Sequence, residues 1–90
     1  MRLIWNNRFV SIYKKWELRH PNLKPKARNA IAQFEQEPFH PILKTHSLVG
    51  ELEGFWAFSI NYEYRIVFSF TDSSRSEAVL LNIGTHDEVY

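Results

Sequence analysis

The chain has 90 residues, a length suited to one domain with a single modest core. Hydrophobic residues make up 44% of it and aromatic residues 16%, so it has enough apolar surface to fold, and intrinsic disorder is not expected. The absence of cysteine excludes a disulfide framework, a thiolate nucleophile and a cysteine-ligated metal site. No apolar run approaches the roughly 20 residues of a membrane span, and no signal-peptide segment is recognisable, so we expect a cytoplasmic protein.

The net charge of +1 hides a strong asymmetry between two parts of the chain. Residues 1–28 contain eight Lys and Arg against one acidic residue, whereas residues 29–90 contain three basic and nine acidic residues. The first part therefore carries +7 and the second −6. Such asymmetry indicates a surface that binds a polyanion such as nucleic acid, although two helices with a lysine-rich solvent face would give the same count.

The first third of the chain is expected to begin with a short strand and a helix. Residues 2–5 are apolar and aromatic, as in a strand, and Asn6 or Asn7 can cap the helix that follows. Pro21 disfavours a helical conformation at His20, so the helix should end there. The apolar residues of this helix recur at a spacing of three and four and share one face: Phe9, Ile12, Tyr13 and Trp16.

A second helix should follow almost at once. Asn22 is a plausible N-cap, and Pro25 is tolerated in a first turn, where its missing N–H costs no hydrogen bond. Pro38 and Pro41 stop the helix and open an extended connection. The same helical spacing recurs at Ala27, Ala30, Ile31 and Phe34. The two helices should therefore form an antiparallel pair.

The remainder of the chain has the pattern of strands. Three are expected, over residues 55–60, 64–70 and 78–83. Residues 61–63 and 71–76 supply the turn and the polar loop between them, Gly84 should end the last strand, and residues 46–52 offer a further short one. Helices followed by strands predict an α+β fold, with an antiparallel meander packed by one face against the helix pair.

The four histidines differ in what their surroundings suggest. His20 and His40 each precede a proline, where a histidine is most simply a polar residue at a helix end or in a loop. No two histidines have the four-residue spacing of a helical zinc site, and no cysteine can complete one, so no metal is expected. The three glycines form no phosphate-binding loop, and no cofactor is expected.

His46 and His86 lie at the two ends of the predicted sheet region, and a meander can bring both to one surface together with Arg65. Imidazole exchanges protons near neutral pH, and a guanidinium can hold a phosphate through two hydrogen bonds. Such a set suits cleavage of a phosphodiester by the neighbouring 2′-hydroxyl of RNA. The alternative is that both histidines are ordinary surface residues at strand ends.

Four segments of the sequence resemble the RelE/ParE toxin superfamily of bacterial type II toxin–antitoxin systems, and most of all its YafQ-like branch. These segments are residues 43–50, 54–56, 64–68 and 83–90. The resemblance spans essentially the whole chain, because the helix pair, the proline break, the meander and the histidine-bearing tail occur in the family's order. It implies a single RelE-like toxin domain over residues 1–90.

The resemblance also implies an activity. The members that this chain resembles most are ribosome-dependent mRNA endoribonucleases (mRNA interferases). They need no metal, cut by attack of the 2′-hydroxyl on the adjacent phosphate, and are neutralised by a cognate antitoxin. By this likeness His86 is the candidate general acid and His46 the candidate base or phosphate contact, with the two roles open to exchange. Arg65 would stabilise the phosphate, and Tyr90 would stack on or position a nucleotide.

Two residues depart from the YafQ-like pattern. Ser59 stands where those enzymes have a further histidine, and Glu63 stands where they have an aspartate. A serine cannot act as a general base near neutral pH, whereas Glu63 keeps a carboxylate that can orient an imidazole or accept the proton itself. The identity of the base is therefore open. Arg65 has an alternative too, because it could pair with Glu63 or Glu51 across strands.

The candidate contacts to the ribosome and its RNA are basic residues, namely Lys14, Lys15, Arg19, Lys24, Lys26, Arg28 and Lys44. Two other functions share the same fold. One is a ParE-type toxin that inhibits DNA gyrase by binding, and the other is a catalytically inactive plasmid-stabilisation or binding module. ParE-type members typically lack the histidine-rich site, so the combination of His46, Arg65 and His86 favours the nuclease.

Overall fold

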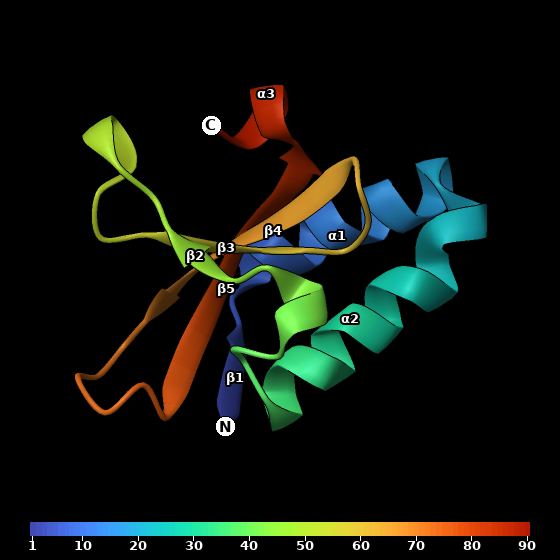
Figure 1. Cartoon of the computed structure of the whole chain (residues 1–90). Coiled ribbons are helices and arrows are strands. Elements are labelled where there is room, and N and C mark those ends of the chain that lie inside the picture. The colour runs from blue at the N-terminus through green and yellow to red at the C-terminus, as the bar shows by residue number, and fades with distance from the viewer.

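A computed structural model describes residues 1–90 and confirms the predicted α+β fold (Figure 1). Its elements are β1 (Arg2–Trp5), α1 (Asn7–Arg19), α2 (Lys24–Gln36), β2 (His46–Ser47), β3 (Trp56–Ser59), β4 (Tyr64–Phe70), β5 (Glu77–Thr85) and α3 (His86–Val89). The strands form one sheet in the order β1-β5-β4-β3-β2. Neighbouring strands are antiparallel except β1, which pairs in parallel with β5.

The two long helices begin in different ways. The Asn6 side chain accepts a hydrogen bond from the Phe9 N–H at 2.7 Å and caps α1, which ends before His20 as predicted. The predicted cap at Asn22 is wrong, because a 3-10 turn over Pro21–Leu23 leads directly into α2. Leu23 already has nearly helical backbone angles, so no extended residue is left to act as a cap. No helix is long and apolar enough to cross a membrane.

The core lies between the helix pair and one face of the sheet. Figure 1 shows α1 and α2 together on one side of the strands, with α3 at the end of the molecule opposite the N-terminus. Phe34 of α2 stacks on Phe58 at 4.3 Å between ring centroids and meets Phe68 edge-on at 4.5 Å. Fully burying a side chain of this size contributes about 1.5–3 kcal/mol. These aromatic contacts therefore hold the helix pair on the sheet.

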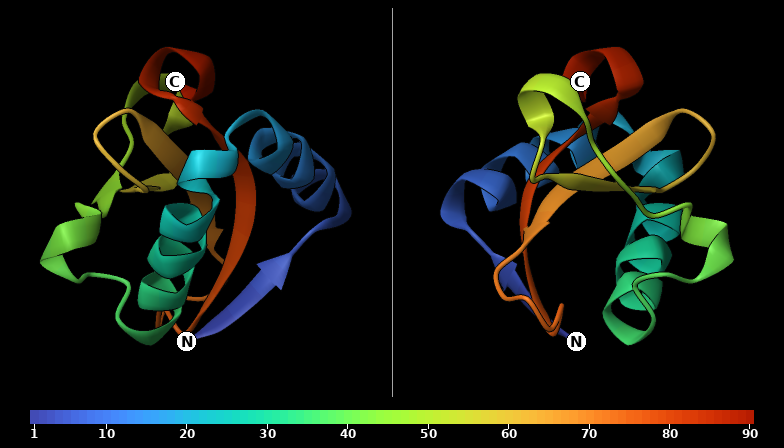
Figure 2. Two further views of the ribbon diagram at one scale, coloured as in Figure 1. Left: turned by 90° about the vertical axis from the view of Figure 1, so that its right-hand side faces the viewer. Right: turned by 60° about the vertical axis from the view of Figure 1, so that its left-hand side comes forward.

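The opposite face of the sheet is covered much less. Side chains alternate along a strand, so Ala57 and Val67 point away from the helix pair. They form a small second cluster with Leu48, from the segment after β2, and Val89, from α3. Figure 2 shows this segment and α3 at the same end of the molecule. This second face, called the open face below, is where His46 and His86 lie.

The last strand and its continuation differ most from the prediction. β5 does not end at Gly84 but runs to Thr85, and a short helix that periodicity did not predict follows it. The predicted strand over residues 46–52 is reduced to His46–Ser47, since the chain turns at a 3-10 helix over Gly50–Leu52. Gly50 has a φ of 71°, a conformation that glycine adopts without strain.

Candidate active site

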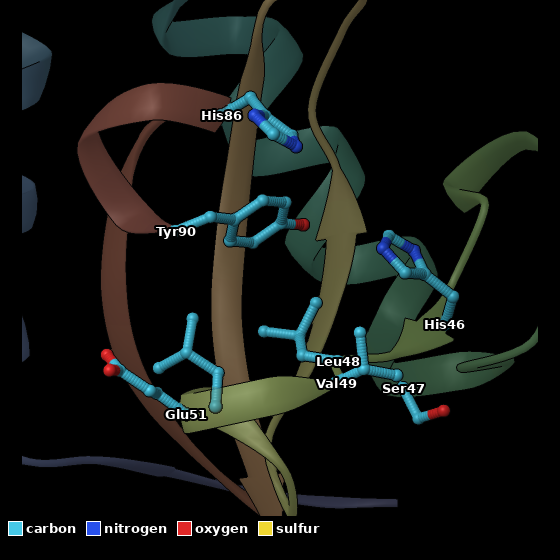
Figure 3. A pocket seen from close by; sticks show the side chains of 8 residues that line it. His46, Ser47, Leu48, Val49, Glu51, His86 and Tyr90 are labelled. Carbon is cyan, nitrogen blue, oxygen red and sulfur yellow. The ribbon is translucent and has the colours of Figure 1, made fainter.

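Both predicted site histidines, His46 and His86, line one hollow of about 450 Å³ on the open face together with Tyr90 (Figure 3). The other lining residues are Ser47, Leu48, Val49, Glu51 and Leu52. The hollow lies between the segment that follows β2 and the short helix α3, two parts of the chain about forty residues apart in sequence. The sheet thus brings together the two segments that the sequence singled out.

His46 reaches the hollow from β2, at the edge of the sheet. It pairs with Ala57 of β3, and directly opposed residues in an antiparallel pair share a face, so its side chain lies on the open face. Its ring Nδ1 lies 2.9 Å from the carbonyl oxygen of Lys44. A carbonyl can only accept, so Nδ1 carries the hydrogen, and in the neutral ring the lone pair is on Nε2. A neutral His46 is thereby set up to accept a proton through Nε2.

His86 is the first residue of α3, and Tyr90 is the cap at its C-terminal end. Their rings meet edge-on with centroids 4.4 Å apart, as expected for side chains four residues apart on a helix. The Tyr90 ring also faces His46, at 6.5 Å between centroids. Figure 3 shows the phenol between the two imidazoles, with its hydroxyl pointing into the space between them. Burial raises the pKa of Tyr90, so its hydroxyl keeps its proton at neutral pH.

Arg65 lies on β4 and is not one of the residues that line the hollow. It pairs with Ser59 and Gly84, a register that puts it one row along the open face from Ala57 and Val67. Its positive charge offsets part of the burial-induced rise in the pKa of Tyr90. Arg65 forms no ion pair with Glu63, Glu51 or any other acid. Its guanidinium is therefore available to an anion.

Glu63 is separate from the other site candidates. It lies exposed in the turn between β3 and β4, where its backbone N–H donates to the Asn61 side chain at 3.0 Å. It does not line the hollow. Ser59 lies across from Arg65 and leaves no third imidazole at that position. A role for Glu63 remains a prediction.

Most of the predicted RNA-binding residues lie on the helix pair, on the other side of the sheet from the hollow. Arg28 is engaged within that pair, because it donates to both carboxylate oxygens of Glu17 at 3.1 and 3.3 Å. Burial alone would raise the pKa of Glu17, but the bonds from Arg28 hold it below its usual value. Lys44 is different, since its backbone carbonyl contacts the His46 ring. The helix pair and Lys44 thus belong to different surfaces.

Comparison with known proteins decides the family. No protein-family model matches the sequence. Toxin YoeB of Escherichia coli K12 is 31% identical over 74 residues, which cover 82% of this chain and 88% of YoeB. The chain belongs to the RelE/ParE superfamily of type II toxins.

Solved structures of other toxins agree with this assignment in fold. YafQ of E. coli BL21(DE3) covers the whole of this toxin, with 99% of its own chain aligned, a TM-score of 0.78 and 16% identity. The YoeB–YefM toxin–antitoxin heterotetramer of Staphylococcus aureus has a TM-score of 0.70 and 17% identity, covering 96% of this chain and 97% of its own. The superfamily predicted from the sequence is therefore confirmed.

One functional feature of the toxin escaped the sequence interpretation. Thr85 and Glu88 form a capping box that starts α3, the helix that begins with His86 and is followed by Tyr90. The pattern Thr-x-x-Glu at residues 85–88 is the usual signal for such a cap.

Proposed function

We propose that this toxin is a ribosome-dependent mRNA endoribonuclease. The observation that supports this best is the arrangement of His46, Tyr90 and His86 around one open hollow. Arg65 adds an unpaired guanidinium on the same face of the sheet. The four side chains supply a proton acceptor, a proton donor and groups that stabilise negative charge, which is the set that cleavage by a 2′-hydroxyl requires.

In the proposed reaction His46 accepts the proton of the ribose 2′-hydroxyl through Nε2, because Nδ1 is held by the Lys44 carbonyl. The 2′-oxygen then bonds to the adjacent phosphorus. His86, in its protonated form, gives a proton to the departing 5′-oxygen as the P–O5′ bond breaks. The products are a 2′,3′-cyclic phosphate and a free 5′-hydroxyl. Arg65 stabilises the additional negative charge on the phosphoryl oxygens.

Tyr90 has a positioning and charge-stabilising role in this scheme. Its phenol keeps its proton, since burial raises its pKa, and it can donate a hydrogen bond to a phosphoryl oxygen. Its ring also offers a surface for stacking a nucleotide that has left the helical stack of the message. Glu63 is retained as a second candidate base, supported by its residue type and not by contact with the hollow.

The proposed partners are a ribosome carrying mRNA and a cognate antitoxin. The antitoxin is suggested by the YoeB–YefM complex, whose toxin has this fold. The basic residues of α1 and α2 suit contacts with ribosomal RNA, and such contacts weaken steeply with salt. We propose that the helix pair docks on the ribosome while the open face acts on the message. A toxin that depends on the ribosome should cut free RNA poorly.

The test is to induce the wild type, His86→Ala and a control, His40→Ala, and to map the 5′ ends of cellular mRNA. His40 lies outside the hollow, where its ring accepts a hydrogen bond from the Ile42 N–H. We expect growth arrest with new mRNA ends for the wild type and His40→Ala, and neither for His86→Ala. Loss of a general acid typically costs about 100- to 10,000-fold.

Two outcomes would contradict the proposal. Arrest without mRNA cleavage would favour a toxin that acts by binding, such as a gyrase inhibitor. Equal arrest by the wild type and His86→Ala would show that the hollow is not where the toxin acts. In a purified system, efficient cleavage of naked RNA would refute the dependence on ribosomes.

A further inference from the structure

The helix α3 is too short to be stable by its own hydrogen bonds. It spans His86–Val89, and one backbone bond, from the Tyr90 N–H to the His86 carbonyl at 3.0 Å, closes its turn. Starting a helical turn is unfavourable in isolation, because several backbone angles are fixed for a single hydrogen bond. Contacts outside the turn must therefore hold the two site rings 4.4 Å apart.

One such contact is the cap at the start of the turn. The Thr85 N–H donates to Glu88 Oε1 at 2.8 Å, and the Glu88 N–H donates to the Thr85 hydroxyl at 3.3 Å. The two residues thus close a reciprocal ring around His86 and Asp87. The hydrogen bonds from Thr85 hold the pKa of Glu88 below its usual value, with a smaller contribution from the positive charge of Arg19. Glu88 therefore remains an ionised acceptor at neutral pH.

The other contact is the close approach of Glu88 and Val89 to Gly84, which has no side chain. A Cβ there would lie 3.0 Å from Glu88 Oε1, 3.1 Å from Glu88 Cβ and 3.1 Å from Val89 Cγ1. The carboxylate could swing aside, but Glu88 Cβ is fixed to the helix backbone, and Val89 is buried against the open-face cluster. A Cβ at this position would therefore require Glu88 and Val89 to move by a few tenths of an ångström. The backbone of Gly84 does not have a positive φ, so its conformation does not require glycine. Glycine is favoured at this position because α3 packs closely against it.

We propose that Gly84, Thr85 and Glu88 are positioning residues of the active site. They touch no substrate in this scheme and act by fixing the turn that carries His86 and Tyr90. The inference rests on the proposed function for its catalytic consequence, but the geometric part stands on the contacts alone. Val89 also holds the turn against the sheet, because it packs in one cluster with Leu48, Ala57 and Val67.

The test compares Glu88→Ala with Glu88→Gln in the full chain. Glutamine keeps the acceptor oxygen of the cap but removes the charge, so it should restore what alanine loses. We expect the rate of mRNA cleavage on ribosomes to fall about tenfold for Glu88→Ala and by less than about threefold for Glu88→Gln. Gly84→Ala should also slow cleavage, by about tenfold, since Glu88 and Val89 must give by a few tenths of an ångström to admit the methyl group. Glu35→Ala on α2 removes the same charge far from the turn and is the matched control.

A second measurement reports the geometry without catalysis. The ring protons of His86 lie near the edge-on Tyr90 ring, so their NMR shifts carry a ring-current contribution. That contribution should shrink in Glu88→Ala and Gly84→Ala, persist in Glu88→Gln and Glu35→Ala, and be abolished by Tyr90→Leu. The melting temperatures of the Glu88 variants should stay near that of the wild type, because the core beneath the helix pair is unchanged.

The outcomes separate this inference from the proposed function. Unchanged cleavage and unchanged His86 shifts in Glu88→Ala would overturn it, as would a Glu88→Gln variant as defective as Glu88→Ala. If the wild type cleaves nothing, the proposed function fails, while the ring shifts still decide whether the cap positions the turn. If Gly84→Ala does not fold, the two Glu88 variants decide alone.

Discussion

The two faces of the sheet differ in how many buried residues cover them. The face under the helix pair has a cluster of 15 buried residues in which large aromatic rings interlock. The open face has a cluster of four, Leu48, Ala57, Val67 and Val89, beneath a hollow lined by polar rings. No charged or polar residue is buried anywhere in the chain. One face therefore supplies most of the stability, and the other is free to keep ionisable groups exposed to a substrate.

The largest effect should come from breaking the helix-facing core. Phe34 is fully buried between two other phenylalanines, so Phe34→Ala leaves a cavity that its neighbours cannot fill. We expect the free energy of unfolding to fall by about 3–5 kcal/mol. Urea denaturation followed by tryptophan fluorescence measures it. A loss below about 1 kcal/mol would mean that the two faces contribute alike.

Arg65→Ala should sharpen the contrast by affecting function and not stability. The guanidinium forms no ion pair, so its loss leaves no unpaired acid behind. We expect mRNA cleavage on ribosomes to fall about 100-fold or more, with the melting temperature nearly unchanged. Arg65→Lys should recover part of the rate, since lysine keeps the charge but not the two-pronged geometry. Full activity in Arg65→Ala would remove this residue from the site.

Val67→Ala tests the thin cluster of the open face. Val67 is buried against Ala57 and Val89, so its truncation removes contacts on the side of the site. We expect about 1–2 kcal/mol of stability to be lost, well below the value for Phe34→Ala. Thermal unfolding measures the loss, and cleavage assays on the same samples show whether α3 shifts. A loss equal to that of Phe34→Ala would contradict the difference between the faces.

The smallest effect concerns a loop outside both faces. Hydrogen bonds from the hydroxyls of Ser76 and Ser74 lower the pKa of Asp72 from 3.8 to about 2. Because the folded value is the lower one, Asp72 stabilises the fold above about pH 4. That contribution is lost as the pH falls through about 2. Asp72→Asn should therefore flatten the dependence of the melting temperature on pH in this window, and a curve parallel to the wild type would contradict it.

Most of the fold could be predicted from local sequence patterns. The helical spacing around Phe9 and Phe34 and the alternation in residues 64–70 each reflect contacts within one element, so the sequence reveals them directly. The parallel pairing of β1 with β5 depends on residues some 75 positions apart and leaves no local pattern. Asn22 failed as a cap because a 3-10 turn took its place.

The candidate site could be predicted only in part, because residue type and order are visible in the sequence but contacts between residues are not. Residue type and order identified His46, His86 and Tyr90, and the structure brings them to one hollow. What sequence could not supply is the tautomer of His46, which a carbonyl two residues back sets, or the close approach that requires glycine at position 84. Glu63 had the right chemistry, but its turn keeps it out of the hollow.

The place of β5 in the sheet has a consequence for synthesis. β5 lies between β1 and β4, yet it is the last strand to be made. Until residues 77–85 have emerged from the ribosome, β1 has no partner strand, and the sheet face that packs against the helix pair is incomplete. Contacts between such distant positions form slowly, after the local ones. The nascent domain therefore cannot complete its fold, or bring the histidine of α3 opposite that of β2, until β5 and α3 have been translated.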